Sequence, residues 1–167
     1  MPEAALARAA PTNAVLANPQ PAQPPQRHGW PMTVADIAMV RAGFALLMQD
    51  MDRCAEMFYA RLVALDPDIR PRQATITMSQ QRRRLMQDLS SLVELLDRPA
   101  DLQRHLMALA RHYGIYGAHD RKFQTARAAL AWTVDRLLEP TAEMQRTAWT
   151  AALDMAEALL GGAKPRV

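Results

Sequence analysis

The sequence predicts an all-α protein, and two observations carry this prediction. After about residue 32, apolar residues recur at intervals of three and four, which is the period of an α-helix. No stretch alternates apolar and polar residues in the way that a half-buried β-strand does. We expect about six to seven helices in one domain over residues 32–162, because a chain of 167 residues that is half hydrophobic suffices for one core.

The two ends of the chain differ in composition from this domain. Residues 1–31 are rich in proline, alanine and glutamine and carry few charges. Such a segment cannot bury enough apolar surface to order itself, so we expect a disordered tail. Residues 163–167 are expected to form a short C-terminal tail.

The first two helices are predicted from their start and stop signals. Thr33 and Asp36 have the spacing of a capping box, and the apolar positions that follow are Ile37, Val40, Phe44 and Leu47. A second helix is expected to end at Asp66, because the residue before a proline, here Pro67, avoids the helical conformation. Its apolar stripe contains Cys54, Met57, Phe58, Leu62 and Leu65.

A long amphipathic helix is predicted from about Thr77 to Arg98, where Pro99 follows. Helical spacing resumes at Leu102 and continues to the glycines Gly114 and Gly117.

Two more helices follow in the sequence. One is expected from His119 to the residues before Pro140. The last has Thr141 as its N-cap and ends at Gly161 and Gly162, because glycine is the preferred residue just after a helix.

Charge and cysteine content exclude several classes of function. The net charge of +3 comes from 20 basic and 17 acidic residues that are well mixed along the chain, so we expect no nucleic-acid partner. No apolar run approaches the roughly 18 residues needed to cross a bilayer, so we expect no membrane partner. The lone Cys54 fits a reducing cytoplasm, and its expected role is that of a small core residue.

Four stretches of the chain follow one another at a characteristic spacing. They are Met57–Leu62 with Leu65–Asp68, Met78–Met86, Leu109–Tyr113, and Tyr116–Phe123 with Ala129–Thr133. In this order they resemble the globin superfamily, in particular single-domain bacterial globins and the haem domain of flavohaemoglobins. The resemblance implies a globin-like fold around haem b.

Matching these stretches residue by residue assigns the distal side of a haem site. Tyr59 and Gln81 correspond to the distal tyrosine and glutamine that hydrogen-bond an iron-bound ligand in this family, and Leu85 takes the apolar position one turn further along. Two polar groups in an apolar cavity would stabilise the partial negative charge on a bound diatomic ligand. The residues alone favour the interpretation of Tyr59 as a core tyrosine with a satisfied hydroxyl and of Gln81 as a surface residue.

The proximal side departs from the family pattern at two positions. Tyr113 falls where the family has its iron-binding histidine, and His112 lies one residue earlier, which rotates it by about 100° on a helix. Gln73 stands where a phenylalanine usually contacts the haem. An anionic tyrosine oxygen would favour ferric over ferrous iron, so we expect gas or redox ligand binding or sensing rather than oxygen carriage.

Several alternatives stay open at this stage. Unwinding at Gly114 would let His112 replace Tyr113 as the iron ligand. A second alternative is a globin fold without haem that acts as a regulatory or protein-interaction module, and a third is bilin or fatty-acid binding in the same cavity. We expect no flavin cofactor and no reductase segment, so a dioxygenase or peroxidase-like activity would need an external electron donor.

Other patterns favour structural explanations. His105, His112 and His119 recur every seventh residue, but the intervening glycines and the lack of further ligands disfavour a zinc site. The run Arg82 to Arg84 is expected to form a solvated helix face, with pairing to haem propionates as a secondary role. The methionines Met48, Met57, Met86 and Met107 are expected to fill the core.

Overall fold

The computed structural model describes residues 31–69, 77–138 and 142–162, and within these ranges the chain is helical with no β-strand. The all-α class is therefore confirmed for the described residues, and none of their helices is both long and apolar enough to cross a membrane. The helices are α1 (Val34–Leu47), the 3-10 turn η1 (Met48–Asp50), α2 (Met51–Leu65), α3 (Met78–Glu94), α4 (Pro99–Tyr113), α5 (Arg121–Leu137) and α6 (Ala142–Leu160).

Two helices begin at reciprocal capping boxes. The Thr33 hydroxyl accepts a hydrogen bond from the backbone N–H of Asp36, and the Asp36 carboxylate accepts one from the backbone N–H of Thr33 at 2.8 Å. Thr77 and Gln80 form the same arrangement at the start of α3. Each box satisfies N–H groups that have no partner inside the helix. The start predicted at Thr33 is confirmed.

The predicted helix ends are confirmed at some positions and wrong at others. α2 ends before Asp66, as predicted, whereas α3 ends at Glu94 and not at Arg98. The N–H of Leu95 bonds to the carbonyls of Leu92 and Ser91, which tightens the last turn and ends the regular helix early. The fifth helix begins at Arg121 rather than at His119, because Asp120 acts as its N-cap.

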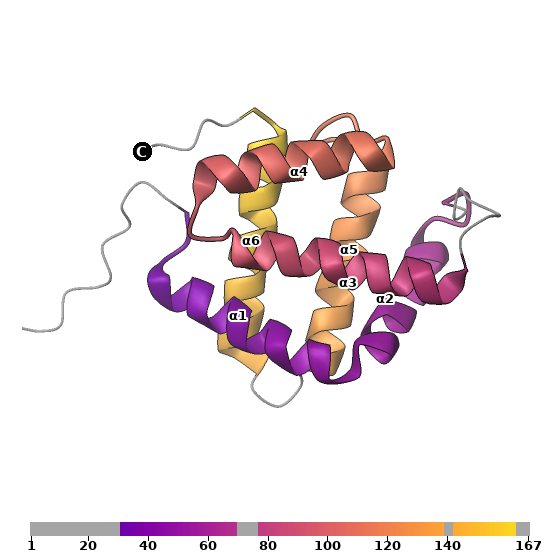
Figure 1. Cartoon of the computed structure of the whole chain (residues 1–167), viewed down its shortest axis with the longest axis horizontal. Coiled ribbons are helices and arrows are strands. Elements are labelled where there is room, and N and C mark those ends of the chain that lie inside the picture. Colours follow the sequence, from indigo (N-terminus) through magenta and orange to yellow (C-terminus); the bar gives the residue numbers. More distant parts are fainter. Residues whose placement is uncertain (1–30, 70–76, 139–141, 163–167) are drawn as a thin grey trace, which may run out of the picture.

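The helices form two crossing layers. In Figure 1, α1, α3 and α4 run across the view, and α5 and α6 run steeply across them behind. α1 packs mainly against α6, while α2 packs against α5 and α3. Elements from opposite ends of the described chain therefore lie side by side.

The core is built from the apolar faces of these helices. Residues predicted for it from helical spacing are buried, including Val40, Phe44, Cys54 and Met86. Four predictions of burial are wrong, since Leu65, Met48, Met107 and, in the last helix, Met144 are each at least 40% exposed. Met48 lies in η1, where the chain departs from the α-helical period, and Leu65 is the last residue of α2. Met107 lies on the outer side of α4, next to the buried Leu106 in sequence.

Some predictions fall outside the described residues. These are the N-terminal tail up to residue 30, the site residue Gln73, the helix boundary at Pro140 and Thr141, and the C-terminal tail over residues 163–167.

Candidate functional site

The predicted iron ligand Tyr113 is the last residue of α4. Gly114 follows it in the left-handed conformation, with φ of 64°, and this ends the helix. From that position the Tyr113 hydroxyl donates a hydrogen bond to Oδ2 of Asp88 on α3, at 2.6 Å. The two helices that would lie on either side of a haem are thus joined directly by side chains.

The surroundings of Tyr113 favour its neutral form. Burial raises the pKa of the phenol, and the hydrogen bond to the Asp88 carboxylate and the negative charge of that group raise it further. Arg84 acts in the opposite direction but has the smallest effect. A phenolate that binds iron needs its pKa lowered. The described neighbours of Tyr113 therefore oppose the ionised form that this role requires.

His112 faces away from this site. Its side chain is exposed in the last turn of α4, and its ring meets the Tyr113 ring edge-on with 5.0 Å between centroids. Basic side chains are favourable near the C-terminal end of a helix, which gives an exposed histidine at this position a structural role.

The predicted distal residues lie where α2 meets α3. The Tyr59 hydroxyl donates to the backbone carbonyl of Gln81 at 3.4 Å, and both residues are partly buried. Burial and the charge of Asp88 raise the pKa of Tyr59. Oε1 of Gln81 is buried and has no hydrogen-bond donor among the described residues. Leu85 packs against both apolar clusters of the core.

Asp88 is the residue of this site that was missed from the sequence. It affects the pKa of both Tyr59 and Tyr113, which places the two tyrosines around one carboxylate. A sequence signal existed, because Gln81, Leu85 and Asp88 are spaced four and then three residues apart and so share one helix face. The structure thus brings together the predicted residues of α2, α3 and α4 around a residue that was not predicted.

The space between α3 and α4 does not fit a haem in this arrangement. A flat macrocycle with an iron ligand from α4 would have to separate the Tyr113 hydroxyl from Asp88. Side chains from both helices also belong to one continuous core, including Met86, Leu89, Leu106 and Ala110. The bond between Tyr113 and Asp88 therefore occupies the place where a haem bound to Tyr113 would lie.

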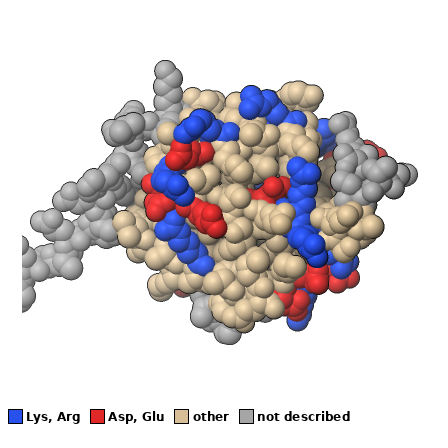
Figure 2. All heavy atoms as spheres, viewed as in Figure 1, with Lys and Arg blue, Asp and Glu red and all other residues tan. Residues whose placement is uncertain are grey.

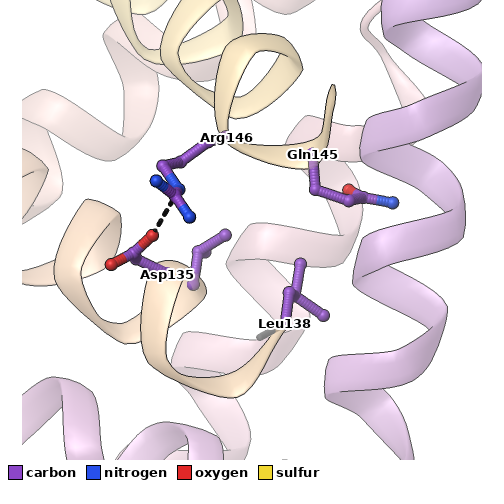
Figure 3. A pocket seen from close by; sticks show the side chains of 5 residues that line it. Asp135, Leu138, Gln145 and Arg146 are labelled. Atoms are coloured by element: carbon purple, nitrogen blue, oxygen red, sulfur yellow. Dashed lines mark ion pairs between the residues drawn. The ribbon is translucent and has the colours of Figure 1, made fainter. Parts of the chain in front are cut away.

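Two hollows of the described structure lie elsewhere. The first is a small cavity of about 10 Å³ between α5 and α6, lined in part by Leu138 and Gln145, with Asp135 and Arg146 paired across it (Figure 3). The second is an open groove of about 680 Å³ between α1 and α6. Its lining is mostly small or apolar, with Asp36 and Glu143 as its acidic members.

Of the three regularly spaced histidines, His105 and His112 lie on α4 and His119 precedes α5. Among the described residues, no three His, Cys, Asp or Glu side chains gather as metal ligands would. His112 and His119 are exposed, and His105 is partly buried with Nε2 unpartnered.

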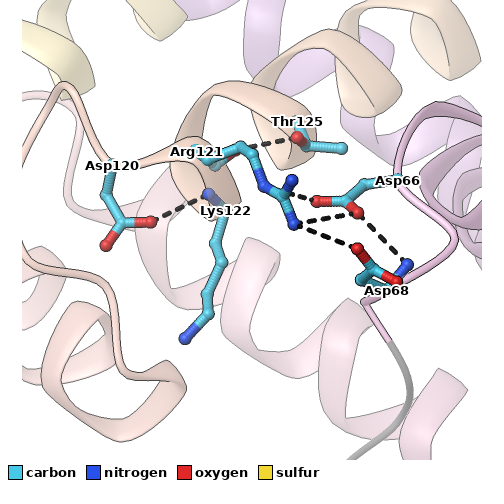
Figure 4. Close-up of polar contacts among 6 residues, drawn as sticks. All are labelled: Asp66, Asp68, Asp120, Arg121, Lys122 and Thr125. Carbon is cyan, nitrogen blue, oxygen red and sulfur yellow. Dashed lines mark hydrogen bonds and ion pairs between the residues drawn. The ribbon is translucent and has the colours of Figure 1, made fainter.

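A polar cluster fastens the end of α2 to the start of α5. Arg121 pairs with the buried Asp66, with 3.0 Å between Nε and Oδ2, and also with Asp68 (Figure 4). Asp120 accepts a hydrogen bond from the backbone N–H of Lys122, whose ammonium donates to the carbonyl of Gly114 at 2.9 Å. The cluster fixes the corner that follows Tyr113.

Charge is unevenly distributed on the face viewed in Figure 1. Figure 2 shows charged side chains of both signs along two opposite sides of this face, with a broad, mostly uncharged area between them. The predicted run Arg82 to Arg84 lies in the first half of α3, where Arg83 and Arg84 are exposed. The prediction of an exposed helix face is therefore confirmed for Arg83 and Arg84, whereas Arg82 is partly buried and pairs with Glu56 of α2.

Comparison with known proteins identifies no family for this chain. No family model matches it, and no curated protein is significantly similar to it.

Proposed function

We propose that this chain is a haem-free module of globin-like shape that acts by binding another protein. One observation carries the proposal: the hydrogen bond between Tyr113 and Asp88 joins α4 to α3 where a haem would lie between them. Evidence against iron binding also comes from the raised pKa of Tyr113 and the outward position of His112.

The globin-like shape is proposed from the sequence resemblance together with the helix arrangement. The two helices that carry the proximal-like and distal-like stretches, α4 and α3, follow one another and lie in the same layer. α5 and α6 cross behind them, as expected when successive helices pack at steep angles around one core.

Binding of a protein partner is supported by the surface. Large apolar side chains are exposed at Val34, Met144 and Tyr116 among others, and Tyr116 is 91% exposed. Grouped apolar surface at a polar rim is typical of interaction sites. Val34 and Met144 lie at or beside the groove between α1 and α6.

A second candidate function is binding of haem b with Tyr113 or His112 as the iron ligand and a small diatomic or ferric-haem ligand on the other side. It is favoured by the buried Oε1 of Gln81, because a buried acceptor without a donor is costly unless another molecule supplies one. Tyr59 also lies beside Gln81, as the resemblance implies.

A hemin titration separates the two functions. The purified full chain is titrated with hemin, and the Soret band is followed in parallel for Tyr113→Phe and His112→Ala. We expect no saturable band and no difference among the three proteins. Uptake of one hemin per chain that is lost in either variant would overturn the haem-free proposal and identify the ligand.

A further inference from the structure

Two arginines contact one tryptophan ring where α2 packs against α5. The guanidinium carbon of Arg61 lies 5.3 Å from the centroid of the Trp132 ring, and that of Arg136 lies 5.6 Å from it. Arg61 comes from α2, whereas Trp132 and Arg136 lie one turn apart on α5. Both distances are within the range of a cation–π contact.

Neither cation has a carboxylate partner among the described residues. Nine ion pairs are present in the described part of the chain, and none includes Arg61 or Arg136. Asp135, which adjoins Arg136 in the sequence, is paired instead with Arg146, with 2.7 Å between Nε and Oδ1 (Figure 3). Two positive charges therefore meet at one indole ring with no described counter-charge.

The Arg61 guanidinium is held in place before any partner binds. Its Nε atom is buried and has no hydrogen-bond acceptor among the described residues, and its guanidinium lies over the Trp132 ring. Stacking on the indole restricts the side chain, so a partner would lose less conformational entropy on pairing with it. Leu65, one turn beyond Arg61, and Ala128, one turn before Trp132, are exposed and add apolar surface.

We propose that the arginine–tryptophan patch, formed by Arg61, Leu65, Ala128, Trp132 and Arg136, binds an acidic segment of a partner protein. Carboxylates of that segment pair with the two guanidiniums in the bidentate manner that arginine favours, and an apolar side chain packs beside the indole. Arginine and tryptophan are also the residues most enriched where binding energy concentrates in protein interfaces. The inference rests on the proposed function, because it assigns a negatively charged binding segment to the proposed protein partner.

The patch is better suited to a peptide than to a phosphate or a membrane. The two guanidiniums come from different helices and share their space with an indole and exposed apolar side chains, which leaves room for separate carboxylates. A compact phosphate would need more donors converging on one point. Anionic membranes are recognised by clusters of many basic residues, whereas this patch contains two.

The test uses a hexaglutamate peptide as the probe and the full chain as the protein. Binding is measured by calorimetry, and the Trp132 indole N–H resonance, assigned with Trp132→Phe, is followed by NMR. We expect Arg61→Gln and Arg136→Gln each to raise Kd roughly tenfold. Arg83→Gln is the matched control, because it removes the same charge from an exposed arginine of α3 and leaves Kd within about twofold.

Further arms separate binding at the patch from general attraction. Arg136 is exposed, so Arg136→Gln keeps the fold, which far-UV circular dichroism verifies. Arg61→Lys keeps the charge but loses stacking and bidentate pairing, and we expect it to bind about as weakly as Arg61→Gln. Any of three results would overturn the proposal. They are a rise in Kd with Arg83→Gln that equals the rise with the patch variants, tighter binding of tripolyphosphate than of the peptide, and no binding at millimolar peptide.

Failure of this proposal is distinguishable from failure of the proposed function. Stoichiometric hemin uptake together with peptide binding at the patch would refute the haem-free function and leave the patch standing. Absence of both would leave the haem-free function standing and refute the patch.

Discussion

The bond between Tyr113 and Asp88 can be tested by replacing Tyr113 with phenylalanine. The substitution removes the hydroxyl that donates at 2.6 Å and retains the ring that meets His112. A hydrogen bond to a charged acceptor contributes about 1.5–3 kcal/mol when it is shielded from water. Tyr113 is 43% exposed and Asp88 is only partly buried, so water can replace the lost donor. We therefore expect the free energy of unfolding to fall by about 1 kcal/mol.

The contribution of this hydrogen bond to the free energy of unfolding can be measured as a coupling energy. The measurement uses urea unfolding of the wild type, Tyr113→Phe, Asp88→Asn and the double variant. The pH dependence gives a second measurement. The pKa of Tyr113 is raised in the folded state above the unfolded value of 10.0, so its contribution is complete below pH 10 and is lost as pH rises toward the folded pKa.

The reasoning about the α3–α4 bond fails on either of two results. A coupling energy near zero would mean that the hydroxyl and the carboxylate do not interact in solution. A loss of stability above pH 10 that is identical in the wild type and in Tyr113→Phe would mean that other groups cause it.

Three further predictions concern the core and its corners. Gly43→Ala places a Cβ 2.5 Å from Oε1 of Gln145. We expect the free energy of unfolding, measured with urea, to fall by about 1–2 kcal/mol although alanine has the better helix propensity. An unchanged urea midpoint would contradict this prediction. Burial raises the pKa of the Cys54 thiol to about 11, so a disulfide reagent at pH 8 should react rapidly only in denaturant, and fast reaction in buffer would disprove its burial. Asp66→Asn removes the buried carboxylate partner of Arg121, and we expect it to lower the free energy of unfolding by about 2 kcal/mol. The control Asp68→Asn removes the exposed partner and should cost less than about 0.5 kcal/mol. Equal losses would refute the distinction between the buried and the exposed partner.

Local sequence signals predict the helices well because they act over a few residues. The capping box at Thr33 fixes a helix start through side-chain hydrogen bonds over three residues, and the stop before Pro67 and the glycine after Tyr113 fix helix ends through backbone geometry. The end of α3 is not predictable in this way, because it depends on a tightened last turn and not on a proline or glycine. The apolar period likewise assigns Met107 to the core, although its side of α4 faces no neighbour.

The site is harder to predict than the helices because it depends on contacts between distant residues. Helical spacing and the globin resemblance select Tyr59, Gln81 and Tyr113; in the structure Tyr113 bonds to Asp88, and Tyr59 bonds to the carbonyl of Gln81. The bond of Tyr113 to Asp88 joins positions 25 residues apart, and no short-range pattern indicates it. The contact of Arg61 with Trp132 also joins residues on separate helices, so each looked like an ordinary helix residue in the sequence.

The packing of α1 on α6 has a consequence for the order of folding. α1 presents Ile37, Val40 and Phe44 to the core, and its main contact is the helix at the far end of the described chain. During synthesis α1 can pack against α3 early, but its main partner is missing until α6 has been made. A helical protein normally folds fast because its contacts are local, whereas this one must close long loops first. We therefore expect slower folding than for a bundle of sequential neighbours, and no stable fold in a fragment that lacks α6.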